Sequence, residues 1–495
     1  MLTGIVVAEA SWVKVIDQTR CIGCHACTTA CKSENRVPLG VTRTYVKSVD
    51  IGVWPLARRA FQVTRCNQCD DAPCVAACPT SAMYRRADGI VDFDKRICIG
   101  CKACIAACPY DAIFINPEDH SAEKCNFCTH RLDIGLEPAC VVVCPTEAIL
   151  VGDVNDPSSK VARIVNREPV TVRRPEKETH PKLFYKGAHQ ATLDPIAARR
   201  PAGDLYMWSE QGEGVRSGHP GGWSNSSAAA VLSYDIPHKA PWDWRVSLYT
   251  WTKSIAAGVY LAPVLLMLLG VEAFAASGVL PSVLGLPFLA VTGALLVWDL
   301  EHPKRFYYIF TRPQWRSWLV RGGAIIVCYG LVLVLSLFAT ESIRTFLVIA
   351  GLPLSLMAAA YTAYLFAQAK GRDLWQSPLL PPHMAVQAVL AGAAALLVVT
   401  GDEWPVATVL TWASVIHLLF VLGETTLPHG TAHAHLAVWE MTRGRYSSVF
   451  WTGVVLVLIG SLAPWIGVWA APAALIGLLA HEHAYVQAGQ AVPLA

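Results

Sequence analysis

Sixteen cysteines between residues 21 and 144 constrain this chain more than any other feature. They form four groups of four, and each group has two closely spaced cysteines followed by two more. Three groups end in Cys-Pro, whereas Lys32 follows the last cysteine of the first group. Thiols at this spacing are typical ligands of metal centres. The groups are Cys21, Cys24, Cys27 and Cys31; Cys66, Cys69, Cys74 and Cys78; Cys98, Cys101, Cys104 and Cys108; and Cys125, Cys128, Cys140 and Cys144.

The cysteine array repeats itself. Asp-Gln-Thr-Arg-Cys-Ile-Gly-Cys at 17–24 returns as Asp-Lys-Arg-Ile-Cys-Ile-Gly-Cys at 94–101. Such self-similarity indicates a duplicated unit. Three thiolates of a tight Cys-x2-Cys-x2-Cys turn can bind three irons of one [4Fe-4S] cluster, while the more distant fourth cysteine, carried by a helix, reaches a second cluster. We therefore expect clusters in coupled pairs, with a short strand at 12–17 and another at 89–94 preceding two of the groups.

Disulfides and structural zinc are the competing interpretations of so many cysteines. Disulfides are disfavoured because residues 1–10 do not resemble an export signal and because the grouping is too tight for a framework that staples loops. Zinc prefers two separated Cys-x2-Cys pairs and does not require the Cys-Pro ending. The spacing favours iron–sulfur clusters over both.

Composition divides the chain into two halves. With 495 residues and 54% hydrophobic content it is too long and too apolar for one soluble domain. Sixteen of the cysteines lie before residue 145, whereas long apolar runs begin near residue 246. The net charge of +3 and the absence of a basic stripe interleaved with aromatics argue against a nucleic-acid partner.

The second half contains eight apolar segments of about the ~20 residues that cross a bilayer. Pro464 and Pro472 interrupt the last two. Cys328, alone within a span, is predicted to be a small buried hydrophobe. The segments are 246–271, 280–298, 318–339, 345–368, 381–400, 404–423, 447–466 and 467–483.

Charge in the loops predicts the orientation. Loops expected on the side of the cysteine-rich half carry nine basic residues, whereas the opposite loops carry only Arg344. The positive-inside rule therefore predicts a protein of the inner (cytoplasmic) membrane with its cysteine-rich half facing the cytoplasm. The nine are Lys304, Arg305, Arg312, Arg316, Arg321, Lys370, Arg372, Arg443 and Arg445.

Between the halves, residues 151 to about 240 are rich in Pro, Gly, Arg and Ser, as at 199–203 and 217–227. This composition predicts an irregular tether. We expect a domain at 1–185, a linker at 186–243 and a membrane domain at 244–495. The predicted fold class is an α/β-type double bicluster ferredoxin-like domain, small and α+β in content, followed by an all-α bundle of about eight transmembrane helices.

Residues 12–185 resemble the four-cluster iron–sulfur subunit of membrane-bound molybdopterin oxidoreductases, the group with dimethyl sulfoxide, polysulfide and tetrathionate reductases. In that family the first and fourth groups form one unit, the second and third form the other, and each unit exchanges its last cysteines. In some relatives one cysteine of the third group is replaced, but the third group is complete here, so the resemblance implies four [4Fe-4S] clusters. The implied ligand sets are Cys21, Cys24, Cys27 and Cys144; Cys125, Cys128, Cys140 and Cys31; Cys66, Cys69, Cys74 and Cys108; and Cys98, Cys101, Cys104 and Cys78.

Residues 298–306, Trp-Asp-Leu-Glu-His-Pro-Lys-Arg-Phe, followed by Trp315, Ser317 and Trp318, resemble the polysulfide-reductase-type (NrfD-like) membrane subunit. That resemblance implies a helical bundle without haem that exchanges electrons with menaquinone or ubiquinone. A bis-His haem is the rival, but His417 lies within a span, His383 at the start of one, and 429–435 in a loop.

Buried ionisable groups in membranes are costly and usually functional, which makes six residues candidates for binding quinone or relaying its protons. The alternative is a purely structural role, in which Asp299 and Arg305 pair at a helix end and Glu424 caps its own helix. Proton pumping would use carboxylates such as Glu272 and Glu424. The six candidates are Lys253, Asp299, His302, Arg305, His383 and Glu424.

These features predict an electron-transfer and membrane-anchor subunit that works beside a separate molybdopterin-containing catalytic subunit. The substrate half-reaction would take place in that partner and not in this chain. Cytoplasmic clusters favour a quinone-reducing complex, as in cytoplasmic sulfite dehydrogenase. The alternatives are a quinol-oxidising reductase of the polysulfide or dimethyl sulfoxide type, and a passive anchor for a soluble redox partner without quinone chemistry.

Overall fold

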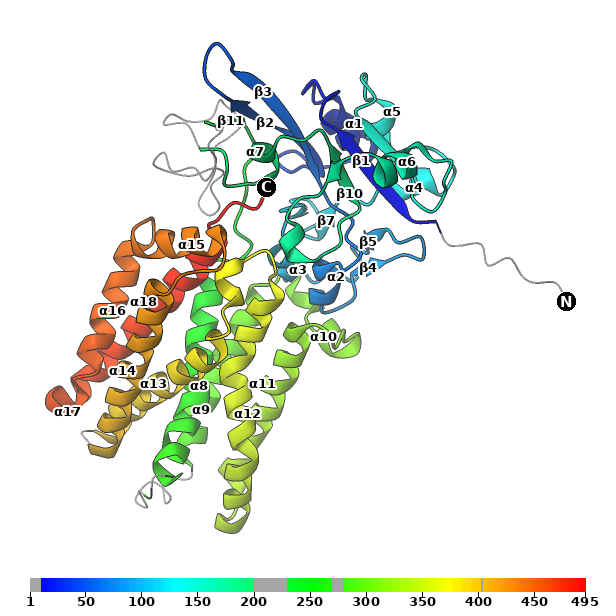
Figure 1. Ribbon diagram of the computed structural model, residues 1–495. Helices are drawn as coiled ribbons and strands as arrows, with labels where there is room; N and C mark the ends of the chain where they lie inside the picture. Colours follow the sequence, from blue (N-terminus) through cyan, green and yellow to red (C-terminus); the bar gives the residue numbers. More distant parts are fainter. Residues whose placement is uncertain (1–9, 200–228, 269, 271–278, 402–403) are drawn as a thin grey trace. The chain divides into compact units, whose positions relative to one another are not determined.

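The computed structural model describes residues 10–199, 229–268, 270, 279–401 and 404–495. The chain forms two compact units (Figure 1). The first comprises Met1–Pro241 with Val492–Ala495, and the second comprises Trp242–Ala491. The first is a small α/β unit and the second is helical, which confirms the predicted fold class.

Within its described residues the first unit contains two larger sheets and two hairpins. Strand β1 runs parallel to β10 and antiparallel to β8 in a sheet of order β8-β1-β10-β9. Side chains along a strand alternate between the two faces of a sheet, so Val13 and Val15 point to the same face of β1. Helix α6 packs against these two residues and covers that face. The elements are β1 (Trp12–Asp17), β8 (Ile149–Asp153), α6 (Lys160–Arg167), β9 (Val170–Thr171) and β10 (Leu183–Lys186).

The second sheet has the order β11-β2-β3, and each short hairpin precedes or follows a cysteine group. The strand predicted at 12–17 is confirmed as β1, and the one predicted at 89–94 is confirmed as the shorter β5. The elements are β2 (Thr44–Ile51), β3 (Arg58–Arg65), β11 (Val231–Tyr234), the hairpin of β4 (Met83–Arg85) and β5 (Val91–Phe93), and that of β6 (Ile113–Ile115) and β7 (Ala122–Lys124).

Short helices lie among the cysteine groups. The third cysteine of every group lies within a helix, whereas the fourth lies within a helix only in the first group and just past the helix end in the others. The third and fourth cysteines are four residues apart, about one helical turn. Helix α1 packs against α5, and α2 packs against α3, which follows the predicted pairing of first with fourth and second with third groups. The helices are α1 (Ala26–Glu34), α2 (Pro73–Ala77), α3 (Ala103–Ala107), α4 (Thr129–Leu132) and α5 (Ala139–Val142).

Lys32, which stands where the other three groups have proline, changes where helix α1 ends. The prolines that follow Cys78 and Cys108 force these cysteines into extended backbone, so α2 and α3 end there. Lys32 imposes no such restriction, and α1 continues past Cys31 to Glu34. The Lys32 ammonium then donates to the carbonyl oxygens of Pro38 (2.8 Å) and Val41 (2.6 Å), which holds the following loop.

The described parts of the expected linker 186–243 belong to the first unit as far as Pro241, and the second unit begins at Trp242. Strand β11 joins β2 because Ala230 and Leu232 bury their side chains with Ala197 and Ala198. Hydrophobic burial and edge pairing thus extend the first unit to Pro241. The irregular stretches predicted at 200–203 and 217–227, and Glu272, lie outside the described residues.

The second unit contains, among its described residues, seven helices long and apolar enough to cross a membrane. The predicted span 447–466 is instead a fourteen-residue helix, α16, followed after Gly460 by the short α17. The final span is longer than predicted. The helices are α8 (Trp244–Leu268), α9 (Leu280–Trp298), α11 (Trp318–Phe338), α12 (Glu341–Gln368), α13 (Leu380–Thr400), α14 (Trp404–Thr426), α15 (Ala432–Thr442), α16 (Ser447–Gly460), α17 (Ala463–Ile466) and α18 (Ala470–Gln490).

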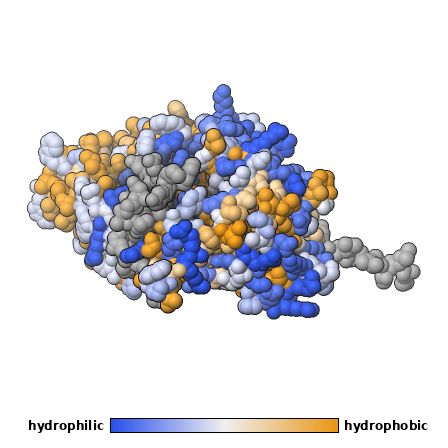
Figure 2. All heavy atoms as spheres, turned by 90° about the horizontal axis from the view of Figure 1, so that it is seen from above, coloured by the Kyte–Doolittle hydropathy of each residue, from blue (hydrophilic) through white to orange (hydrophobic). Residues whose placement is uncertain are grey.

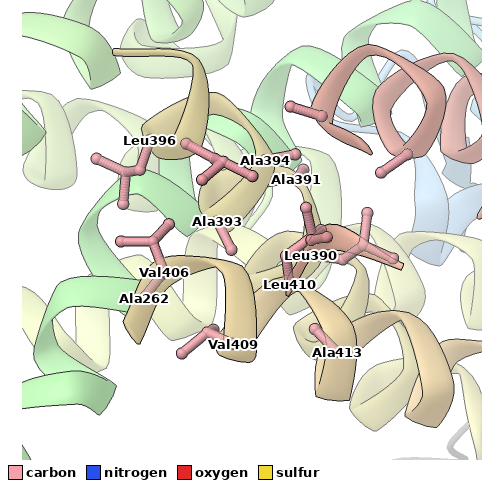
Figure 3. Close-up of a cluster of buried hydrophobic side chains, with 14 of the residues drawn as sticks. Ala262, Leu390, Ala391, Ala393, Ala394, Leu396, Val406, Val409, Leu410 and Ala413 are labelled. Atoms are coloured by element: carbon pink, nitrogen blue, oxygen red, sulfur yellow. The ribbon is translucent and has the colours of Figure 1, made fainter. Parts of the chain in front are cut away.

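Helix α8 lies at the centre of the second unit, where it packs against α9, α12, α13 and α18. Gly258 and Gly392 let α8 and α13 approach backbone to backbone, because a Cβ on Gly258 would lie 1.7 Å from the carbonyl oxygen of Ala388. Figure 3 shows the apolar core beside this contact, where Ala262 of α8 meets side chains of α13 and α14. Small residues thus set the packing, as in other membrane bundles.

The outward faces of the long helices are apolar, as expected of surfaces that contact lipid. Cys328 lies on such a face of α11 and is exposed, so the prediction of a buried Cys328 is wrong. The side chains of Trp465 in α17 and of Trp469 shortly after it are exposed, and exposed tryptophans at helix ends are common in membrane proteins. Figure 2, by contrast, shows many hydrophilic residues over the face of the first unit that it presents.

Candidate functional site

Three separate cavities in the first unit are each lined by four cysteines. The quartets combine cysteines from two different groups, one supplying three and the other its last member. Each cavity therefore lies between a turn and a short helix from another part of the sequence. The quartets are Cys21, Cys24, Cys27 and Cys144; Cys31, Cys125, Cys128 and Cys140; and Cys78, Cys98, Cys101 and Cys104.

The remaining four cysteines also lie together. Cys74 interacts electrostatically with Cys66, Cys69 and Cys108, and all four are buried in one cluster. None of the seventeen cysteines, all of them within the described residues, forms a disulfide. The geometry thus brings together the same four quartets that the resemblance implied.

Backbone amides point at several of the sulfurs. Met83 donates to Cys78 Sγ (3.4 Å), Ala122 to Cys98 Sγ (3.4 Å) and Ala148 to Cys144 Sγ (3.2 Å). Such N–H···S bonds stabilise thiolate charge and tune the potential of a bound cluster. A residue in the left-handed conformation comes shortly before each of these amides, namely Ser81 (φ 56°), His120 (φ 53°) and Glu147 (φ 50°).

Arg65 is the strongest sign that an anionic group belongs in this unit. Its guanidinium is buried, donates from Nη1 to Cys140 Sγ (3.0 Å), and leaves Nε and Nη2 without partners among the described residues. Burial would raise the pKa of the Cys140 thiol, but Arg65 and Lys14 outweigh it and lower the pKa. A buried cation with unpaired donors fits an iron–sulfur cluster with thiolate ligands.

At other cysteines the nearby cations do not outweigh the effect of burial. Burial, followed by repulsion from neighbouring thiolates, raises the pKa of Cys31 and of Cys69 to about 12. These thiols therefore stay protonated at neutral pH in the metal-free protein, and iron must displace their protons on binding.

His238 forms a buried ionic triad with Asp111 and Asp235 in the first unit. Its Nδ1 hydrogen-bonds the carboxylate of Asp111, and its Nε2 lies 3.2 Å from Asp235 Oδ1. Burial alone would lower the pKa of His238, but the two carboxylates outweigh it and raise the pKa to about 10. The triad ties the segment after β11 to the loop that follows Cys108, a link that the sequence did not reveal.

We expect His238→Gln to destabilise the first unit by about 3–5 kcal/mol at pH 7, because it leaves buried carboxylates without their cation. The raised pKa gives stability that is fully present below about pH 6.5 and is lost as pH rises through about 10. Denaturant unfolding of the holoprotein, followed by cluster absorbance, should therefore show a smaller difference at pH 10. His180→Gln is the control, since it removes an exposed pair with Asp71 and should cost less than about 1 kcal/mol. Equal losses in both variants would contradict this role.

In the second unit the six candidate residues fall into three places. Asp299, His302 and Arg305 lie at the end of α9 and in the loop that follows. Asp299 Oδ1 is 3.7 Å from Arg245 Nη2 at the start of α8. Lys253 lies apart in the middle of α8, where it is fully buried and donates to Thr362 Oγ1 (2.7 Å) and the Ala359 carbonyl (2.8 Å).

His383 and Glu424 form the third place, together with His417. His383 Nε2 lies 2.9 Å from His417 Nδ1, and His383 Nδ1 lies 3.4 Å from Glu424 Oε1. From the sequence, His417 is expected within a membrane span and His383 at the start of one, so the two are not expected to meet. In the structure their side chains meet between the antiparallel helices α13 and α14. His481 of α18 completes a buried group and was missed. The His-Glu-His run at 481–483 within an apolar span was the available signal.

Cysteine quartets in a small α/β unit, joined to a bundle of apolar helices, define a membrane-anchored iron–sulfur protein. Residues 58–154 match the family model of the 4Fe-4S dicluster domain, and residues 12–33 match that of a 4Fe-4S binding domain. Residues 234–493, more than half of the chain, match the model of polysulphide reductase, NrfD. This protein belongs to the NrfD family and carries an iron–sulfur domain fused before the membrane part. It is a multi-pass membrane protein.

Curated relatives match about 34–40% of this chain. A subunit of the tetrathionate reductase of Salmonella typhimurium is 42% identical over 208 residues, which are 40% of this chain and 80% of the relative. A component of the polysulfide reductase of Wolinella succinogenes is 44% identical over 171 residues, 34% of this chain and 90% of the relative. The putative dimethyl sulfoxide reductase iron-sulfur subunit of Halobacterium salinarum is 37% identical over 221 residues, 39% of this chain and 84% of the relative.

Proposed function

We propose that this chain conducts electrons between a separate molybdopterin-containing catalytic subunit and the membrane quinone pool. The observation that carries the proposal is the set of three cavities, each lined by four cysteines that come from two sequence groups. With the fourth quartet they would hold four [4Fe-4S] clusters, which when bound carry single electrons. The protein's own residues would bind the clusters and exclude water from them, and its backbone amides and Arg65 donate hydrogen bonds to the cysteine sulfurs that would ligate them.

The exchanged ligand sets make a sharp prediction. Cys144→Ser should abolish the same cluster as Cys24→Ser, although Cys144 is next to Cys140 in its own group. Cys31→Ser should likewise abolish the same cluster as Cys128→Ser. Each substitution is expected to remove, or to convert to a three-iron form, one cluster and at most about a quarter of the iron. Potentiometric EPR of the purified protein, with iron analysis, distinguishes the signals.

Cys328→Ser is the matched control, because Cys328 lies on the exposed face of α11 far along the sequence from the array. It should retain full iron content and every EPR signal. If Cys144→Ser instead matched Cys128→Ser, each group would hold its own cluster and the exchange would be refuted.

For quinone we favour the end of α9 over the other two places. Asp299, His302 and Arg305 border exposed Trp298 and Phe306, so a quinone ring arriving from the lipid could reach them. His302 or Arg305 would donate to a quinone carbonyl, and Asp299 beside Arg245 would exchange protons. Lys253, His383 and Glu424 are enclosed by neighbouring helices, which makes them poorer candidates for direct contact.

The quinone proposal is tested by reoxidation. The purified protein, reduced with dithionite and freed of excess reductant, should be reoxidised when a water-soluble ubiquinone or menaquinone analogue is added. Arg305→Gln should slow this reaction at least about tenfold, the cost of one hydrogen bond to a charged group. Arg312→Gln, which removes an equal charge from an exposed side chain of the same loop, should not. Equal behaviour of both variants would exclude this quinone site, and no quinone effect at all would favour the passive anchor.

The proposal also covers the side of the membrane that the cluster domain faces and the direction of electron flow. Basic residues gather at the end of the bundle where α8 begins, which supports a cytoplasmic cluster domain and a quinone-reducing complex, as in cytoplasmic sulfite dehydrogenase. The relatives are named as reductases, which favours a quinol-oxidising complex as the second candidate. Copurification of the catalytic subunit, with its substrate half-reaction, separates the two.

A further inference from the structure

Three histidines from three membrane helices converge in the second unit. His383 of α13, His417 of α14 and His481 of α18 are all buried, and one ring nitrogen from each lies within 4.8 Å of the others. The ring centroids of His417 and His481 are 4.8 Å apart and those of His383 and His417 are 4.9 Å apart. Neither the cluster chemistry nor the proposed quinone site uses these rings.

The group contains polar atoms that the surrounding helices do not satisfy. His481 Nδ1 and Glu424 Oε2 have no hydrogen-bond partner among the described residues, although both side chains are more than nine-tenths buried. Unsatisfied polar groups at such positions are costly in a membrane. A small cavity with room for about one water molecule adjoins His383 and His481. That space suits an ion with one additional small ligand and is far too small for a haem or a quinone ring.

We propose that His383, His417 and His481 bind one divalent transition-metal ion, with zinc as the expected occupant, and that the ion ties α13, α14 and α18 together. Neutral imidazoles are preferred ligands of such ions. Ligand nitrogens about 2.0–2.1 Å from zinc would stand roughly 3.3 Å apart, so side-chain rotations suffice to reach the ion from this arrangement. The adjoining cavity leaves a position for a water as the fourth ligand.

Glu424 has the position of an orienting carboxylate. Its Oε1 contacts His383 Nδ1 (3.4 Å) and leaves Nε2 directed toward His417. Metal-binding histidines commonly donate their second ring nitrogen to a carboxylate in this way, which fixes the tautomer and strengthens the ligand. Glu424 therefore acts as a positioning residue for His383.

The test uses the purified holoprotein, loaded with one equivalent of zinc after removal of loosely bound metal. Zinc-edge X-ray absorption should show nitrogen and oxygen neighbours near 2.0 Å with imidazole scattering, distinct from the roughly 2.3 Å of thiolate ligands. His417→Gln and His481→Gln should lose this zinc and keep full iron content. Glu424→Gln should weaken zinc affinity about 10- to 100-fold. His483→Gln, two residues along α18 and in contact with Ser247, should bind zinc like the unchanged protein.

Sulfur neighbours around the zinc would mean that it replaces iron in the cysteine quartets, and equal zinc binding in every histidine variant would mean an adventitious ion only. Either result, or failure of the unchanged holoprotein to bind zinc, overturns the proposal. Should the histidine variants fail to accumulate, the absorption spectrum of the unchanged protein still decides between nitrogen and sulfur ligands.

Discussion

Replacing Arg65 with Gln is expected to lower the reduction potential of the cluster proposed at Cys31, Cys125, Cys128 and Cys140 by on the order of 100 mV. A unit charge about 6 Å from an added electron, at an effective dielectric constant of about 20, contributes roughly 2.8 kcal/mol. Arg65 is fully buried, lines this cavity and contacts Cys140 Sγ at 3.0 Å, so water does not screen it. Potentiometric EPR titration of the purified protein measures the shift.

Two substitutions control for charge and for folding. Arg65→Lys retains the charge and should shift the potential far less than Arg65→Gln. Arg20→Gln removes a charge next to Cys21, but that side chain is 42% exposed and already pairs with Glu147, so solvent screening should leave all potentials almost unchanged. Full iron content is required in every variant. A potential insensitive to Arg65→Gln would show that this cation serves the fold and not the cluster.

Gly392→Ala is expected to destabilise the helical unit by roughly 3 kcal/mol, at the upper end of the usual cost of overpacking. A Cβ on Gly392 would lie 1.9 Å from the carbonyl carbon of Gly258, and backbone atoms on α8 have no room to retreat from the centre of the bundle. Unfolding in mixed detergent, followed by tryptophan fluorescence, measures the loss. Cluster absorbance shows in the same sample whether the first unit is intact.

Gly293→Ala is the matched control, since no atom lies within 4 Å of a Cβ at this position in the middle of α9. Alanine favours helix over glycine by about 1 kcal/mol, so this variant should be neutral or slightly more stable. The two changes are chemically identical, and opposite signs would locate the effect at the contact between α8 and α13. Equal effects would argue against close packing of these helices.

The four cysteine groups and the long helices could be predicted because their signals are local. Four cysteines within eleven residues place one turn and one short helix, as Cys21 to Cys31 illustrate, and about twenty apolar residues in succession predict a span. The pairing of groups came from a family resemblance and not from spacing. Strand β11 could not be foreseen, because its only support is the pairing with β2 and burial of Leu232.

The helical site was harder to predict because its members meet only through tertiary packing. His383, His417 and His481 are separated by 34 and 64 residues, and the sequence offers no periodicity that links them. The sequence predicts different depths for His383 and His417 along their spans. The two side chains nevertheless meet, because a histidine side chain extends several ångströms between antiparallel helices. Arg65 was equally hidden, because nothing near it in sequence indicates that it lies beside Cys140.

The spacing of four residues between the third and fourth cysteines of each group has a consequence for electron transfer. Cys27 and Cys31 line neighbouring cavities from the single helix α1, so the two metal centres proposed there would be held apart by one rigid helical turn. On the opposite side of these cavities, Cys140 lies in α5 and Cys144 lies just beyond the end of that helix. Tunnelling rates depend steeply on distance, and a rigid helix varies little in length. Thermal motion should therefore modulate the hop from one pair to the other far more than the hop within a pair, and a slow step between pairs would set the rate of the whole relay.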